Sequence, residues 1–175
     1  VRVFSEIGST SSEAKRILAE ETVDERLPLL LVADRQSGGR GRLGRAFYSP
    51  EGSGLYCSLL YATEEAMESA LRVTSFCAVA VMRAIRRLTG KQTAIKWVND
   101  LYLLAADDTH APLGKLAGIL CEAVPLDGDA TRILVGWGIN LTTRSFPSDL
   151  RAPAASLLSP DEEDTLTADF MGNLA

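Results

Sequence analysis

Residues 38–45 read GGRGRLGR and concentrate arginine and glycine in a chain whose formal net charge is −5. Arginine presents fixed N–H donors that match carboxylate and phosphate groups. Glycine has no side chain, so its backbone N–H can approach a bound ligand closely. The stretch therefore predicts a loop that binds an anion. Composition alone also leaves open a solvated, arginine-rich turn.

Three further stretches combine residue types that could bind a polar ligand. KWVND (96–100) reads as a strand whose final Asn-Asp pair could hold a hydrated Mg²⁺ or a ribose, although Asn-Asp is also ordinary turn chemistry. GKLAG places Lys115 at a strand start, where a lysine is otherwise simply solvated. In VGWGIN, Gly136 and Gly138 fall on one face of a strand and predict either a floor without side chains or a bulge.

Two common kinds of site are not supported. Gly39, Gly41 and Gly44 spell GxGxxG, but a dinucleotide-binding fingerprint needs a helix directly after it, and RAFYSPEGSG follows here. His110 is the only histidine and has no cysteine near it in sequence, which argues against a transition-metal site and a Ser–His–Asp hydrolase. Lysine, arginine and carboxylate side chains are therefore expected to carry any chemistry.

The elements that would position these residues follow from hydrophobic periodicity and turn residues. Thr10 and Glu13 match a capping box that would begin the first helix, and Gly90 would end the second. The turn DGD (127–129) predicts an antiparallel hairpin. The order of elements predicts an α+β fold with a mixed, largely antiparallel sheet flanked by helices. The expected helices are 9–21, 64–89 (core face Val73, Phe76, Ala80, Ile85 and Leu88) and a last one begun by TLTADFMGNLA, and the expected strands are 27–34, 54–62, 93–98, 114–124 and 131–141.

Composition indicates one globular domain, residues 1–175. Hydrophobic residues make up 46% and charged residues 23%, and no apolar run is long enough to cross a membrane. The N-terminal residues lack the apolar core of a signal peptide. Three cysteines without short spacing predict reduced thiols and a cytoplasmic location.

Taken in order, five stretches resemble the motifs of biotin protein ligases: STSSEAK, RQSGGRGRLGRAFYSPEGSGLYCSL, IKWVNDLYL, GKLAGILCE and VGWGINL. The resemblance covers roughly residues 1–175 and implies the central catalytic domain, an α/β sandwich related to class II aminoacyl-tRNA synthetases, without the N-terminal helix-turn-helix and the small C-terminal β-barrel. It implies an enzyme that joins biotin to ATP, giving biotinyl-5′-AMP. The biotinyl group would then pass to a lysine of a biotin carboxyl carrier protein, such as that of acetyl-CoA carboxylase.

The resemblance also implies roles for individual residues. Lys115 and Arg40 would be catalytic, with Lys115 contacting both the biotin carboxylate and the α-phosphate. Mg²⁺ would lie near Asn99 and Asp100. The implied biotin site is Ser9, Thr10, Gln36, Gly39, Arg40, Arg42, Lys115, Gly118 and Gly138, and the implied ATP site is Arg45, Phe47, Lys96, Asn99, Asp100 and Asn140.

Two positions depart from the family pattern. Val98 stands where the family usually has proline, which would alter the rigidity of the strand end. Phe47 stands where the family often has tryptophan, and its smaller ring would shelter the adenine less, which predicts a lower affinity for the nucleotide.

Several alternatives stay open beside the ligase. One is a lipoate or octanoate ligase or transferase of the same superfamily, and another is a biotin-binding sensor without turnover. Binding to nucleic acid is disfavoured by the net charge of −5. The expected partners are biotin, ATP and the carrier protein, with no DNA and no membrane, and a homodimer is left open.

Overall fold

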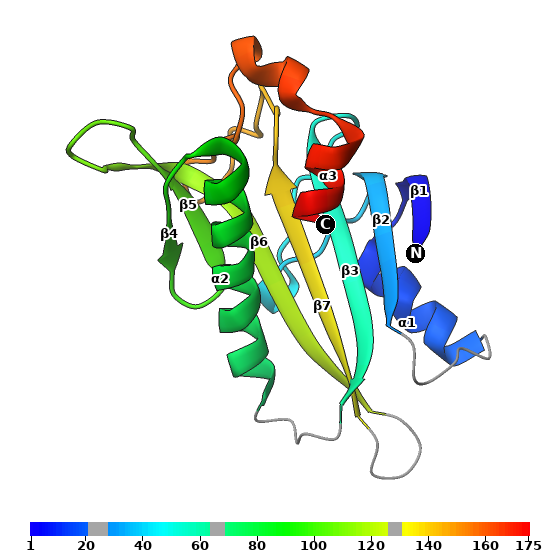
Figure 1. Ribbon diagram of the computed structural model, residues 1–175. Helices are drawn as coiled ribbons and strands as arrows, with labels where there is room; N and C mark the ends of the chain where they lie inside the picture. The colour runs from blue at the N-terminus through cyan, green and yellow to red at the C-terminus, as the bar shows by residue number, and fades with distance from the viewer. Residues whose placement is uncertain (21–27, 64–68, 126–130) are drawn as a thin grey trace.

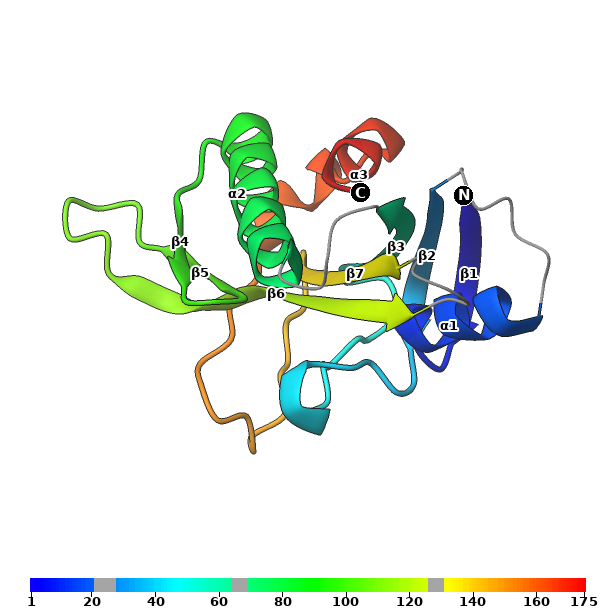
Figure 2. The ribbon, with the colours of Figure 1, turned by 90° about the horizontal axis from the view of Figure 1, so that it is seen from below.

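One mixed sheet runs through the molecule and separates two layers of helices (Figures 1 and 2). The computed structural model describes residues 1–20, 28–63, 69–125 and 131–175. Helices α2 (Ser69–Thr89) and α3 (Ala168–Leu174) cover one face, and α1 (Thr10–Glu20) and the 3₁₀ turn η1 (Arg42–Gly44) lie on the other. The seven strands in sheet order are β1 (Arg2–Ile7), β2 (Leu29–Gln36), β3 (Gly54–Thr63), β7 (Thr131–Asn140), β6 (Pro112–Pro125), β5 (Asp100–Leu104) and β4 (Thr93–Lys96).

Pairing in the sheet confirms the expected fold class. Only β1 and β2 run parallel among the described strands, and every other neighbouring pair is antiparallel. The hairpin of β6 and β7 is confirmed, while its turn at 127–129 lies outside the described residues. None of the helices in the described part of the chain is long and apolar enough to cross a membrane.

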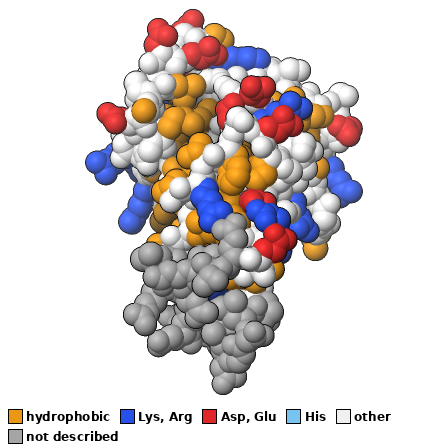
Figure 3. Space-filling view, turned by 90° about the vertical axis from the view of Figure 1, so that its right-hand side faces the viewer, with side chains coloured by type: hydrophobic (Ala, Val, Ile, Leu, Met, Phe, Trp, Pro, Cys, Tyr) orange, Lys and Arg blue, Asp and Glu red, His pale blue; other side chains and the backbone are white. Residues whose placement is uncertain are grey.

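Two strands were missed by the sequence analysis. β1 lies at the sheet edge, where Val1 and Val3 are 85% and 76% exposed, and Figure 3 shows hydrophobic side chains surfacing on this side. Its apolar residues therefore do not mark a buried face. β5 was missed because the predicted strand 93–98 ends at Lys96, and the chain reverses before Asp100. The reversal covers residues 97–99, so the turn interpretation holds for Asn99, while Asp100 is the first residue of β5.

The predicted capping box of α1 is wrong. The helix begins at Thr10, so Ser9 precedes it and accepts the Glu13 N–H at its carbonyl oxygen, 2.9 Å away. The Thr10 hydroxyl is turned instead toward β2 and donates to Gln36 Oε1 at 3.1 Å. Glu13 pairs with Arg16 one turn along the helix. A tertiary hydrogen bond to Gln36 therefore engages the Thr10 side chain, which the local sequence pattern had assigned to a helix cap.

The buried face of α2 follows the prediction in part, because Ile85 is buried and Val73 and Leu88 pack against the core as expected. Phe76 is 72% exposed and Ala80 is exposed, whereas Ala78, Val81 and Ile85 lie in the core at helical spacing. Gly90 ends the helix as predicted, with a φ of +71° and its N–H bonded to a carbonyl of the last turn. Residues 64–68 of the predicted helix lie outside the described residues.

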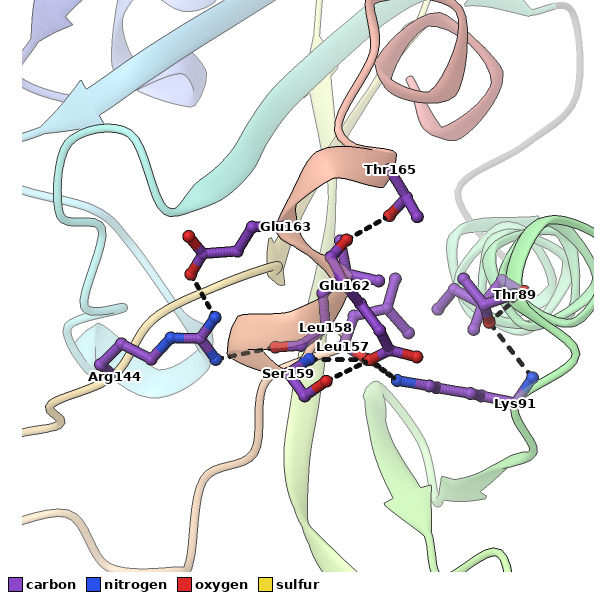
Figure 4. A network of polar contacts seen from close by, with 10 residues as sticks. Thr89, Lys91, Arg144, Leu157, Leu158, Ser159, Glu162, Glu163 and Thr165 are labelled. Carbon is purple, nitrogen blue, oxygen red and sulfur yellow. Dashed lines mark hydrogen bonds and ion pairs between the residues drawn. The ribbon is translucent and has the colours of Figure 1, made fainter.

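A polar network fastens the C-terminal residues beside the end of α2 (Figure 4). Lys91 Nζ lies 2.5 Å from Glu162 Oε2 in the 3₁₀ turn η2 (Pro160–Thr165), and the Ser159 N–H donates to the same oxygen at 2.8 Å. Arg144 pairs with Glu163 nearby. The hydrogen bond from Lys91, with further ones from Ser159, lowers the pKa of Glu162 to about 2.

This shift predicts how stability depends on pH. A carboxylate with a lowered pKa in the folded state stabilises the fold above its unfolded pKa of about 4.5, and that contribution is lost as pH falls toward 2. In Glu162→Gln the fall in melting temperature between pH 6 and pH 3 should be smaller than in the wild type. Asp161→Asn, which removes a neighbouring charge from the same turn, should follow the wild type in thermal melts. Equal pH dependence of Glu162→Gln and the wild type would contradict the assignment.

Candidate active site

Most of the predicted site residues meet at one cavity of about 200 Å³ on the α1 face of the sheet. They come from the start of α1, the end of β2, the glycine–arginine loop, the start of β5, and the facing strands β6 and β7. The predicted residues that line this cavity are Ser9, Thr10, Gln36, Arg40, Arg42, Arg45, Phe47, Asn99, Asp100, Lys115, Gly118 and Gly138. The sheet therefore collects residues that lie more than a hundred positions apart in sequence.

Hydroxyl and amide groups form one end of the cavity, where α1 begins. The Thr10 backbone N–H and hydroxyl both donate to Gln36 Oε1, at 2.9 and 3.1 Å, and Gln36 Nε2 donates to Ser49 Oγ at 3.0 Å. The hydroxyls of Ser11 and Ser58 complete the group. The sequence analysis missed these two serines and Ser49, although a serine within the apolar strand YCSLL was a usable signal of a buried polar site.

The glycine–arginine loop folds back as a closed turn beside this end. Gly41 N–H donates to the Arg45 carbonyl at 2.7 Å, and Phe47 N–H donates to the Gly39 carbonyl at 2.9 Å. Gly39 lies behind the cavity lining, and a Cβ there would come within 2.4 Å of the Phe47 carbonyl oxygen. The arginine side chains are held only loosely: Arg42 Nη1, for example, lies 3.4 Å from Asn99 Oδ1. They are therefore free to turn toward an anion in the cavity.

Lys115 faces Asp100 across the other end of the cavity, with Nζ 2.8 Å from Oδ1. Oδ1 has no hydrogen-bond partner of good geometry, so the pair is held by charge rather than by a directed bond. The backbone of Lys115 is fixed by residues 153–155, whose Pro153 carbonyl accepts its N–H at 2.7 Å. Asn140 Nδ2 donates to the carbonyls of Lys115 and Ala155, at 3.3 and 3.2 Å, and clamps the two segments together.

Gly136 and Gly138 both line the cavity and form a floor without side chains, as one of the two sequence interpretations predicted, and Gly118, which pairs with Gly138, extends it. β7 pairs with β3 and β6 without a register shift, so there is no bulge at these positions. The Phe47 ring lies on this floor, and a Cβ on Gly138 would come within 2.5 Å of it. The Lys115 ammonium lies 5.7 Å from the ring centroid.

A second cavity of about 480 Å³ adjoins the first. The two share Arg45, Ala46, Phe47, Asp100 and Lys115, while Asn140 lines only the second. Its outer wall comes from residues 146–154, which the sequence analysis treated only as a loop. Two adjoining cavities with a lysine and an arginine at the junction suit two ligands that react with each other.

Two predicted features, Lys96 and a preformed metal site, are not found at the two cavities among the described residues. Lys96 lies outside both cavities, with Nζ 3.2 Å from the Tyr102 hydroxyl and 5.0 Å from its ring centroid. Among the residues that the structure describes, no group of three histidine, cysteine or acidic side chains is placed to hold a metal. His110 is exposed, as expected for a loop residue.

Comparisons with known proteins agree with this geometry. The biotin/lipoate A/B protein ligase family matches residues 9–140. The bifunctional ligase/repressor BirA of Salmonella typhimurium is 37% identical over 119 residues, which are 68% of this chain and 35% of that protein. The chain thus spans about a third of the length of this relative.

Two solved structures of biotin protein ligases are similar over almost the whole chain. The enzyme of Aquifex aeolicus in complex with biotin and ATP has a TM-score of 0.70 at 30% identity, covering 98% of this chain and 67% of that one. The enzyme of Leishmania major in complex with biotinyl-5-AMP has a TM-score of 0.72 at 25% identity, covering 99% and 70%. With a family match over well more than half of its residues and this shared fold, the chain belongs to the biotin/lipoate A/B protein ligase family.

Proposed function

We propose that the protein is a biotin protein ligase, which activates biotin with ATP to biotinyl-5′-AMP and passes the biotinyl group to a lysine of a biotin carboxyl carrier protein. The observation that carries the proposal is the pair of adjoining cavities that share Lys115. The smaller cavity would take biotin and the larger one ATP. The solved relatives hold biotin with ATP, or biotinyl-5-AMP, which supports this assignment.

The first step brings together two anions, and the shared residues suit that task. A carboxylate oxygen of biotin would bond to the α-phosphorus while the bond to the β-phosphate oxygen breaks and pyrophosphate leaves. Lys115 and Arg45, at the junction, would offset the charge of the transition state. Arg40 and Arg42 would cover the product, because a mixed anhydride hydrolyses when water reaches it. In the second step the acceptor lysine would attack the biotinyl carbonyl and AMP would leave.

Asn99 and Asp100 fit a Mg²⁺ that arrives with the nucleotide rather than one bound beforehand. Among the described residues, Asp100 is the only carboxylate that lines the smaller cavity, and it lines the larger one together with Asp149. Mg²⁺ in nucleotide sites is commonly held by one or two carboxylates together with the phosphates. When bound, the ion would supply further positive charge for the departing pyrophosphate.

The polar end of the smaller cavity favours biotin over octanoate or lipoate. Ser9, Thr10 and Ser11 are at most 6% exposed, and together with Gln36 they offer hydrogen bonds to a polar head group. A hydrocarbon or dithiolane head would leave these groups unpaired, which costs more than a missing methylene would. Calorimetric titration should therefore show biotin binding at least tenfold more tightly than octanoate or lipoate. Preference for an acyl chain would overturn the choice of substrate.

A cytoplasmic location is part of the proposal. Cys57, Cys77 and Cys121 are all free thiols in the structure. Burial raises the pKa of the Cys57 thiol to about 12, which keeps it protonated and unreactive. Reduced cysteines suit the cytoplasm.

Lys115→Met should slow formation of biotinyl-5′-AMP by about 30- to 1000-fold, the loss expected when a transition-state charge of about 2–4 kcal/mol is removed. Rapid-quench assays of adenylate would measure it. Arg86→Met removes a positive charge from the exposed side of α2, on the opposite face of the sheet, and should leave the rate unchanged. A Lys115→Met enzyme as fast as the wild type would remove this residue from the mechanism.

Arg40→Ala should weaken retention of biotin and its adenylate without lowering the melting temperature. The side chain is exposed, and its one polar contact with the described residues is a 3.4 Å approach to the Ser12 hydroxyl. Release of biotinyl-5′-AMP, followed by stopped-flow fluorescence, should be faster in the variant. Release at the wild-type rate, with unchanged biotin affinity, would show that Arg40 does not cover the ligand.

A further inference from the structure

We propose that Ser58 is a positioning residue that sets which hydroxyl groups of the smaller cavity accept hydrogen bonds from the ligand. The inference rests on the proposed function, because it concerns how the head group of biotin is recognised. Ser58 does not line the cavity itself. It would act through Thr10 and Ser11, which do.

Ser58 is completely buried in the middle of β3 and faces the start of α1. Its Oγ lies 2.8 Å from Thr10 Oγ1 and 3.0 Å from Ser11 Oγ. A buried hydroxyl needs hydrogen-bond partners, and these two contacts supply them. Through the single oxygen of Ser58, β3 thus fixes the side chains of Thr10 and Ser11 at the start of α1.

The direction of these hydrogen bonds follows from counting protons. Each hydroxyl has one proton to donate. Thr10 donates its proton to Gln36 Oε1, so Ser58 must be the donor in its contact with Thr10. Ser58 then has no proton left for Ser11, so Ser11 donates to Ser58. The result is one directed chain from Ser11 through Ser58 and Thr10 to Gln36.

In this chain of hydrogen bonds the hydroxyl protons of Thr10 and Ser11 are already donated, so both oxygens can only accept hydrogen bonds from a ligand in the cavity. Gly136, on the neighbouring strand β7, keeps the space in front of them open: a Cβ there would lie 2.9 Å from Ser11 Oγ and 3.4 Å from Ser58 Oγ. A cyclic urea carries two N–H groups that need acceptors. An alkyl or dithiolane head carries no N–H group. The chain of hydrogen bonds therefore favours the urea of biotin over these two head groups.

Without Ser58 the two hydroxyls would lose this fixed direction. Ser11 would have a free proton that can point at the N–H groups of the ligand, and Thr10 would lose the donor that fixes its lone pairs. A mispositioned hydroxyl weakens recognition of the head group but leaves the nucleotide cavity untouched, because neither Thr10 nor Ser11 lines that cavity. Loss of Ser58 should therefore lower the affinity for biotin and leave the affinity for ATP unchanged.

The test is calorimetric titration of the chain with biotin and, separately, with ATP. Ser58→Ala should raise the Kd of biotin roughly 5- to 30-fold, the effect of one or two disturbed hydrogen bonds, while the Kd of ATP stays within twofold. Ser58→Cys keeps a weaker donor of similar size and should recover part of the biotin affinity. Thr89→Ala removes a hydroxyl that donates to the Ile85 carbonyl at 2.8 Å in α2, away from both cavities, and should leave both affinities unchanged.

Each outcome decides between the claims. Unchanged biotin affinity in Ser58→Ala would overturn the inference and leave the proposed function standing. Equal weakening of biotin and ATP with a lowered melting temperature would show a structural role instead, and would also overturn it; Ser58→Cys serves the same comparison if the alanine variant does not fold. Absence of biotin binding by the wild type would overturn the proposed function, and the inference with it.

Discussion

The ion pair of Lys115 and Asp100 lies where the two cavities meet, and much of the fold serves to hold it there. Asp100 opens β5 and Lys115 lies on β6, so the pairing of these two strands brings the charges to 2.8 Å. Residues 153–155 add a short strand-like contact beside Lys115, and Asn140 bonds to both segments. A cation held in this way needs little reorganisation when an anionic ligand arrives, and such preorganised charge is the largest source of rate enhancement in many enzymes.

Close packing against the glycine backbone is the second constraint on the site. The floor made by Gly118 and Gly138 is filled by the Phe47 ring, which leaves no room for a Cβ at Gly138. Gly39 is equally restricted, because the glycine–arginine loop packs directly on the backbone of residues 47–49. Gly138 and Gly39 thus have two separate uses, one in the floor and one in the packing of the loop.

The sequence was most informative where local pattern and tertiary environment agree. The hairpin of β6 and β7 could be predicted because both strands are buried and apolar, and Gly90 because a helix end needs a left-handed residue. Twelve residues of the predicted site were brought to one cavity, but they were identified through a family resemblance rather than through periodicity. The Asn-Asp pair of KWVND was a local turn signal, but the predicted strand 93–98 ran past the reversal that follows Lys96. No local signal showed that Thr10 turns away from its helix to meet Gln36. That contact depends on β2, which lies further along the chain. Lys96 belongs to the KWVND motif and was therefore assigned to the site, but in the fold it lies outside both cavities.

The most direct test of the central claim is biotin-dependent exchange of labelled pyrophosphate into ATP, with Mg²⁺ present and octanoate and lipoate as substitutes for biotin. Exchange reports reversible formation of the acyl-adenylate at the junction of the two cavities and requires no acceptor protein. We expect exchange with biotin and at most background exchange with the other two acids. Exchange that depends on octanoate or lipoate would contradict the assignment of biotin as the substrate. Biotin binding without any exchange would show a sensor rather than a ligase.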